Sequence, residues 1–172
     1  MKSVQVRNVK RPVAEVVAEV VAEIEQKEWW RAVCVRDIMT SPVICVDSLT
    51  TVTDAQQLMK EQQIRRLPVI DDGKLMGMLT QGDIRGALPS EVTTLNQTEL
   101  AYLSKQLKVN RVMAREVIVA TEAMSLGDAA RLLVQYKIGG LPVLAGDNVV
   151  GMVTESDIFG VVVAMFDKLD QI

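Results

Sequence analysis

Hydrophobic and polar positions follow two different patterns along this chain, and the first covers its N-terminal part. Between residues 13 and 24, valines recur every three or four positions with glutamates opposite them, which predicts an amphipathic helix over 12–31. Pro12 suits the first turn of such a helix. Residues 1–11 contain four basic residues, no acid and little periodicity, so we expect a flexible arm there.

The second pattern begins near residue 35 and occurs twice, 74 residues apart. Residues 35–84 align with 109–158 without a gap, and each copy contains Leu-Pro-Val and ends in Thr followed three positions later by Asp. An ungapped match of this length indicates an internal duplication. We predict repeats at 32–88 and 109–172, the second with an extended C-terminal helix, joined by a linker helix within 89–108.

Each copy predicts the element order β-α-β-β-α, which is an α/β (α+β) fold. Thr51-x-x-Asp54 and Ser125-x-x-Asp128 fit capping boxes that begin the first helices. Gly and Asp residues between paired apolar runs predict hairpin turns. The expected strands are 43–46, 67–70 and 74–80 in the first copy, and 117–120, 141–144 and 149–154 in the second. A second helix follows each hairpin.

The corner at the end of each copy, G-h-h-T-x-x-D where h is apolar, allows two interpretations. Thr80 with Asp83, and Thr154 with Asp157, fit helix N-caps whose carboxylate lies at the positive end of the helix dipole. The same hydroxyl and carboxylate beside free backbone N–H groups also suit a ribose and its phosphate. Local spacing alone favours the cap.

Composition indicates the cellular compartment and excludes some classes of partner. The chain has 172 residues, 49% of them hydrophobic and 24% charged, which is enough for one or two small domains with a core. Cys34 and Cys45 show no CxxC spacing, so we expect a reduced, cytoplasmic protein. No segment has the length of a membrane span, and no signal peptide is expected. The net charge of −3 and the scattered basic residues argue against nucleic acid as a partner.

The residues that most catalytic sites need are missing from the sequence. There is no histidine, which removes histidine bases and metal ligands. Neither GxxxxGK[ST] nor GxGxxG occurs. No cluster suggests a nucleophile or a metal site for a hydrolase or kinase. We therefore expect no enzyme activity, no catalytic residue, no metal and no catalytic cofactor.

The repeated unit resembles the cystathionine-β-synthase (CBS) domain, in which [IV]-x-x-LPV precedes the second strand and G-h-h-T-x-x-D forms the last corner. Two such units in tandem resemble a Bateman module, and the resemblance extends from about Val35 to Phe166. The order of parts is similar to that of stand-alone bacterial CBS-pair proteins of the acetoin-utilisation AcuB type. The N-terminal helix is additional to that pattern. The resemblance implies two units packed about a pseudo-twofold axis, with two clefts for adenosine-containing ligands.

The resemblance also implies which residues bind: the Thr and Asp of the corner meet ribose and phosphate, and apolar residues hold adenine. For one cleft it implies Thr154, Asp157, Met113 and Val117. For the other it implies Thr80, Asp83, Thr40 and Val43.

The two positions that directly precede Leu-Pro-Val distinguish the two predicted clefts. The first copy has Arg65-Arg66 where the second has Gly139-Gly140. The resemblance places the arginines toward phosphates in the Thr154/Asp157 cleft, where each guanidinium contact contributes about 1.5–3 kcal/mol. The glycines would border the Thr80/Asp83 cleft, which should favour a less anionic ligand or bind weakly. The alternative is that both arginines are solvated surface residues.

The leading functional hypothesis is a regulatory module. It would bind AMP, ADP or ATP, or another adenosyl compound such as S-adenosylmethionine, and signal to a partner by rearrangement. The competing hypothesis is a structural adaptor with non-functional clefts. Apolar surface on the 12–31 helix and on residues 159–166 suggests a homodimer, and the N-terminal helix is also a candidate contact for a regulated protein.

Overall fold

The computed structural model describes residues 33–87 and 106–169. The chain divides into two units, Met1–Val33 and Cys34–Ile172. The expected arm (1–11) and N-terminal helix (12–31) lie outside the described residues, as does most of the linker helix. Leu107, at the end of that linker, is not helical and packs against the first hydrophobic core.

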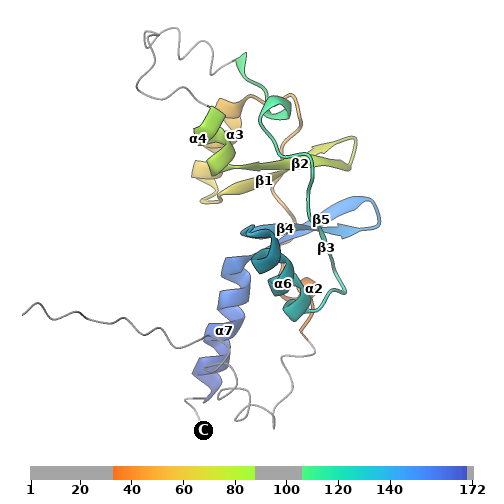
Figure 1. Ribbon diagram of the computed structural model, residues 1–172, viewed down its shortest axis with the longest axis vertical. Helices are drawn as coiled ribbons and strands as arrows, with labels where there is room; N and C mark the ends of the chain where they lie inside the picture. Colours follow the sequence, from red (N-terminus) through yellow and green to blue (C-terminus); the bar gives the residue numbers. More distant parts are fainter. Residues whose placement is uncertain (1–32, 88–105, 170–172) are drawn as a thin grey trace, which may run out of the picture. The chain divides into compact units, whose positions relative to one another are not determined.

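The described residues form the mixed α and β architecture that the duplication predicts (Figure 1). The first half contains α2 (Val35–Ile38), α3 (Val52–Glu61), β1 (Arg66–Asp71), β2 (Lys74–Thr80) and α4 (Gln81–Ala87). The second half contains the 3₁₀ helix η2 (Val109–Arg111), β3 (Ala120–Thr121), α6 (Leu126–Tyr136), β4 (Gly140–Ala145), β5 (Asn148–Thr154) and α7 (Glu155–Leu169). In Figure 1, α3 and α4 lie beside the β1–β2 hairpin, and α6 and α7 lie beside the β4–β5 hairpin.

Local chemistry explains where these elements begin and turn. The hydroxyl of Thr51 accepts a hydrogen bond from the backbone N–H of Asp54 at 3.1 Å, and that of Ser125 accepts one from Asp128 at the same distance, so both residues are the helix N-caps that the sequence predicts. Each aspartate accepts a hydrogen bond from the cap hydroxyl, at 2.6 and 2.7 Å. Asp72 and Gly73 have φ of 50° and 80° between the paired residues Asp71 and Lys74. Two consecutive positive φ values are typical of a two-residue hairpin turn that matches the twist of the strands.

The strands form one five-stranded sheet in the order β1-β2-β5-β4-β3. Each hairpin is antiparallel, β3 is parallel to β4, and the two hairpins meet through a single pair, Lys74 with Asn148. The predicted first strands 43–46 and 117–120 are shorter than expected. The first is reduced to a bridge between Val46 and Val69, and the second to β3. Both segments lie at an edge of the sheet, where they have a strand neighbour on only one side.

The segment that begins each copy crosses to the other copy. Thr40 pairs with Met152, and the equivalent Ala114 pairs with Met78. The two hydrophobic cores are mixed as a result, because Val109 and Met113 belong to the core of the first hairpin while Val35 belongs to that of the second. Each hydrophobic core therefore contains residues of both predicted repeats, 32–88 and 109–172.

This crossing explains why each corner motif begins with a glycine. A Cβ at Gly77 would lie 2.6 Å from the carbonyl oxygen of Ala114, and a Cβ at Gly151 would lie 2.6 Å from Sδ of Met39. The crossing segments thus run directly over the two glycines. Only a residue without a side chain allows this approach.

The last helix is longer than its counterpart, as predicted, and carries exposed apolar residues. Phe159, Val162, Val163 and Phe166 follow the i, i+3, i+4, i+7 spacing of one helix face, with exposures of 39–65%. None of the helices within 33–87 and 106–169 has the length and apolar character needed to cross a bilayer.

Candidate functional site

A cavity of about 250 Å³ lies where the two hairpins and the first crossing segment meet. This is slightly below the roughly 300–1,000 Å³ of drug-sized ligand pockets, so it suits a nucleoside-sized group. The crossing segment supplies Thr40, Val43 and Ile44, the first copy supplies Gln63, Ile64, Arg65, Arg66 and Pro68, and the second copy supplies Met152, Thr154 and Ser156.

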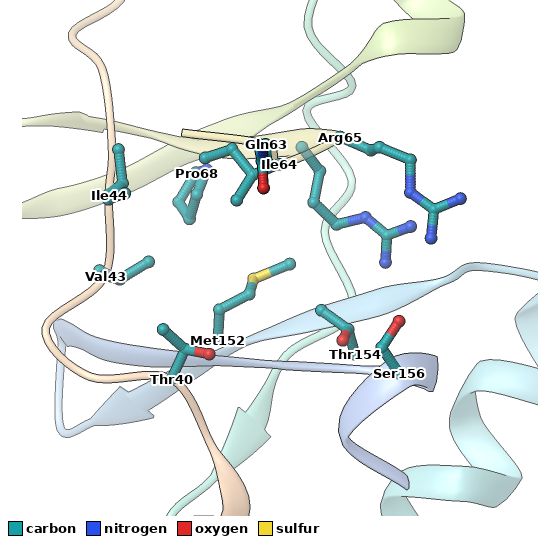
Figure 2. A pocket seen from close by; sticks show the side chains of 11 residues that line it. Thr40, Val43, Ile44, Gln63, Ile64, Arg65, Pro68, Met152, Thr154 and Ser156 are labelled. Carbon is teal, nitrogen blue, oxygen red and sulfur yellow. The ribbon is translucent and has the colours of Figure 1, made fainter. Parts of the chain in front are cut away.

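The lining is divided by chemistry (Figure 2). Val43, Ile44, Ile64, Pro68 and Met152 form apolar walls. Figure 2 shows Arg65 on one side of the cavity, with Thr154 and Ser156 on the opposite side. The site therefore combines a slot suited to a flat apolar group with an end suited to hydroxyls and an anion.

Thr154 is held in place by Asp157. Its backbone N–H and its hydroxyl both donate to Oδ2 of Asp157, each at 2.7 Å. Because the hydroxyl proton points to the carboxylate, the oxygen offers lone pairs to a donor such as a ribose hydroxyl. Asp157 is not among the residues that line the cavity. The N-cap and the site therefore use the same pair, and Asp157 acts through Thr154.

Thr80 and Asp83 form the same arrangement in the first copy. The N–H and hydroxyl of Thr80 donate to Oδ2 of Asp83 at 2.8 and 2.6 Å. These two residues are not in the cavity described above.

Arg66 is the most constrained cation of the site. Its Nη1 is buried without a hydrogen-bond partner in the described part of the chain. Burial lowers the pKa of the Arg66 guanidinium, nearby Glu155 raises it, and Arg65 lowers it. An unpartnered guanidinium nitrogen lining a cavity is costly unless a ligand fills its hydrogen bond.

The glycine pair makes room for this guanidinium. A Cβ at Gly139 would meet Nη2 of Arg66, and a Cβ at Gly140 would meet Nη1 and would lie 3.0 Å from its Cδ. The prediction for these glycines concerned a border of the Thr80/Asp83 cleft. In the structure they contact the arginine of the first copy.

The structure corrects the predicted grouping of the other residues. Thr40 and Val43 were assigned to the cleft of Thr80 and Asp83, but they line the cavity with Thr154. Met113 was assigned to Thr154, but it lies in the core of the first hairpin and beside Gly77. Val117, predicted beside Met113, is not in the Thr154 cavity. Thr40 and Val43 lie with Thr154 because the segment that carries them crosses to the second copy.

The sequence analysis also missed several lining residues. Met152 and Thr154 are two positions apart on β5, so strand alternation places both on one face. Ser156 is inside the corner motif, and Ile64 and Pro68 are inside the LPV motif. These motifs could therefore have identified them.

No metal centre is formed by the residues of 33–87 and 106–169, where no three His, Cys, Asp or Glu side chains are grouped suitably.

Comparison with known proteins gives a consistent result. A family model described as the CBS domain matches residues 35–90 and 109–164. The CBS domain-containing protein YhcV of Bacillus subtilis is 36% identical over 124 residues, which cover 72% of this chain and 81% of that protein.

Three solved structures are similar over most of their length. The CBS domain pair of protein MJ0100, in complex with 5′-methylthioadenosine and S-adenosyl-L-methionine, has a TM-score of 0.66 and 30% identity, covering 78% of this chain and 98% of that one. An acetoin utilization protein (AcuB) from Vibrio cholerae has a TM-score of 0.67 and 28% identity, covering 81% and 97%. CBSX2 in complex with AMP has a TM-score of 0.62 and 29% identity, covering 77% and 97%.

Proposed function

Because this chain belongs to the CBS-domain family and contains two such domains in tandem, we propose that it is a regulatory module that binds an adenine nucleotide in the Thr154 cavity. The observation that carries the proposal is Arg66, a residue of a largely apolar lining whose buried Nη1 has no hydrogen-bond partner among the described residues. Adenosyl compounds and AMP in two similar CBS pairs support the ligand class. The protein has no catalytic role in this proposal.

Each part of the nucleotide has a chemical counterpart in the cavity. Adenine suits the slot between Val43, Ile64 and Met152, where its flat faces replace water at apolar side chains. Ribose hydroxyls donate to Thr154, whose own proton is held by Asp157. The phosphate lies toward Arg65, Arg66 and Ser156. This places AMP, ADP or ATP ahead of ligands without a phosphate, including S-adenosylmethionine.

The corner of the first copy has the same Thr–Asp pair, and we propose a second, weaker site there. Thr80 and Asp83 would serve it together with Val117 of the second copy. The second copy has Gly139 and Gly140 where the first has Arg65 and Arg66, so this second site would lack the equivalent cations and should prefer a less anionic ligand.

Signalling requires that occupancy changes something a partner can detect. The exposed stripe of α7 (Phe159, Val162, Val163 and Phe166) supports assembly into a homodimer, because paired apolar faces remove each other from water. The N-terminal helix expected from the sequence is a second candidate contact for a regulated protein. A structural adaptor would use these same surfaces without a ligand.

Calorimetric titration of AMP separates the two functions. Wild type should bind, and Arg66→Gln should bind about 10- to 100-fold more weakly, because one charge-assisted hydrogen bond contributes roughly 1.5–3 kcal/mol. Arg131→Gln is the matched control, since Arg131 is an exposed arginine on α6 that pairs with Asp128. Equal affinities in all three proteins would remove Arg66 from the site. No binding to wild type would favour the adaptor.

A further inference from the structure

Glu155 places a negative charge beside the cation of the proposed phosphate site. It is the first residue of α7, directly after Thr154. A Cβ at Gly139 would lie 2.9 Å from Oε2 of Glu155 and 3.0 Å from Nη1 of Arg66. The carboxylate and the guanidinium therefore border the same small space above Gly139.

The two groups are close without satisfying each other. Nη1 of Arg66 has no hydrogen-bond partner among the described residues, and the side chain of Glu155 is exposed. Burial lowers the pKa of the Arg66 guanidinium, and nearby Glu155 opposes this effect, so the carboxylate acts electrostatically on the guanidinium. Glu155 is not among the residues that line the cavity, but a ligand phosphate that contacts Arg66 comes near its carboxylate.

The internal repeat shows that the helix does not need this charge. The equivalent position in the first copy is Gln81, which begins α4 as Glu155 begins α7. Their backbone N–H groups make equivalent bonds, to the carbonyl of Arg65 at 3.0 Å and to that of Gly139 at 3.2 Å. A neutral side chain of the same size therefore supports the same corner.

The acidic residue and the two arginines thus come from different copies. Arg65 and Arg66 occur with neutral Gln81, whereas Gly139 and Gly140 occur with Glu155. The start of β1 lies against Gly139 and Gly140 of the second copy, which brings Arg66 and Glu155 to one site. At the Thr154 cavity, therefore, the acid lies beside Arg66, a lining cation that is expected to bind an anion.

We infer that Glu155 is a specificity-determining residue, which competes with ligand phosphate for Arg66 and so limits how strongly the site favours highly charged nucleotides. This inference rests on the proposed function. Glu155 weakens the binding of anionic ligands in proportion to their charge, and it leaves an uncharged adenosyl ligand unaffected. Its removal therefore changes the ranking of ligands as well as their affinity.

The test is calorimetric titration of adenosine, AMP and ATP into wild type and Glu155→Gln, which introduces the residue of the first copy. AMP should bind roughly three- to tenfold more tightly to the variant, and ATP should gain at least as much, since two like charges a few ångströms apart repel even near the surface. Adenosine affinity should stay within about twofold. The gain should shrink at high salt, which screens exposed charges.

The control is Asp147→Asn, which makes the same change from carboxylate to amide in the turn between β4 and β5. It should leave all three affinities unchanged. If the ratio of AMP to adenosine affinity is the same in Glu155→Gln as in wild type, Glu155 serves only the helix start and the inference fails.

Weaker AMP binding by the variant would also overturn it, because the carboxylate would then hold the ligand. If AMP binding depends on Arg66 and not on Glu155, only this inference falls. If wild type binds none of the three ligands, the proposed function falls with it.

Discussion

Substitution of Gly77 by alanine tests the crossing of the copies, on which the whole cavity depends. The new Cβ would lie 2.6 Å from the carbonyl oxygen of Ala114 and 2.7 Å from Sδ of Met113. The methionine can move, but the backbone of Ala114 is held to Met78 by two hydrogen bonds of 2.8 and 2.9 Å. Relief of the contact must therefore strain or break this bridge.

The expected loss follows from these contacts. Overpacking of a tight site costs about 1–3 kcal/mol, and each weakened backbone hydrogen bond contributes about 0.5–1.5 kcal/mol. We expect Gly77→Ala to lower the free energy of unfolding by about 2–4 kcal/mol. Gly151→Ala should lose less, about 1–2 kcal/mol, because its Cβ at 2.6 Å meets the movable Sδ of Met39, and the carbonyl of Thr40 is farther away at 3.1 Å.

Urea unfolding followed by far-UV circular dichroism measures these differences, provided that the m-values agree. Gly160→Ala is the control, because a Cβ there meets no atom within 4 Å and the residue lies inside α7. It should stabilise the protein by about 0.5–1 kcal/mol through helix propensity. If Gly77→Ala were as stable as wild type, the segment 109–114 would not pack on the first hairpin.

Two further predictions concern the site and the loss of folding stability at low pH. Gly140→Ala should displace the guanidinium of Arg66 and weaken AMP binding about tenfold in calorimetry. Less than about 1 kcal/mol should be lost in urea unfolding, because the new Cβ meets only the flexible side chains of Arg66 and Met152. The hydrogen bond from the backbone N–H of Ser48 at 2.9 Å holds the pKa of Asp71 below its ordinary value of 3.8. A lowered folded pKa stabilises the protein above pH 3.8, and this contribution is lost as pH falls through the folded value. Asp71→Asn should therefore flatten the loss of urea stability on acidification below about pH 5.

The sequence predicted the elements well because their signals are local. The caps at Thr51 and Ser125, the turn at Asp72-Gly73 and the apolar runs of β1 and β2 are each determined within a few residues. The duplication then supplied the family and the fold.

The set of residues that lines the cavity could not be predicted from local sequence signals. Whether Thr40 lies beside Thr80 or Thr154 depends on which copy the preceding segment packs against, and an ungapped repeat aligns equally well in both cases. The only sequence trace of the crossing is the glycine at 77 and 151, where a backbone passes close by. The orientation of Arg66 toward Gly139 and Gly140 was equally hidden, since it depends on side chains of both copies.

The crossing also explains how a small ligand can influence the arrangement of the whole unit. The cavity is lined by residues of three parts of the chain: the crossing segment that begins the first copy, the rest of the first copy, and the second copy. The two hairpins themselves are joined in the sheet by only one pair, Lys74 with Asn148. A ligand shifts a conformational equilibrium only by the difference in its affinity for the two states. A nucleotide that contacts Thr40, Arg66 and Thr154 at once loses contacts whenever the hairpins move apart, so its binding energy favours the arrangement that keeps all three together. A ligand confined to one copy would have no such preference. Under the proposed function, simultaneous contact with Arg66 of the first copy and Thr154 of the second therefore matters more for regulation than the affinity of either contact.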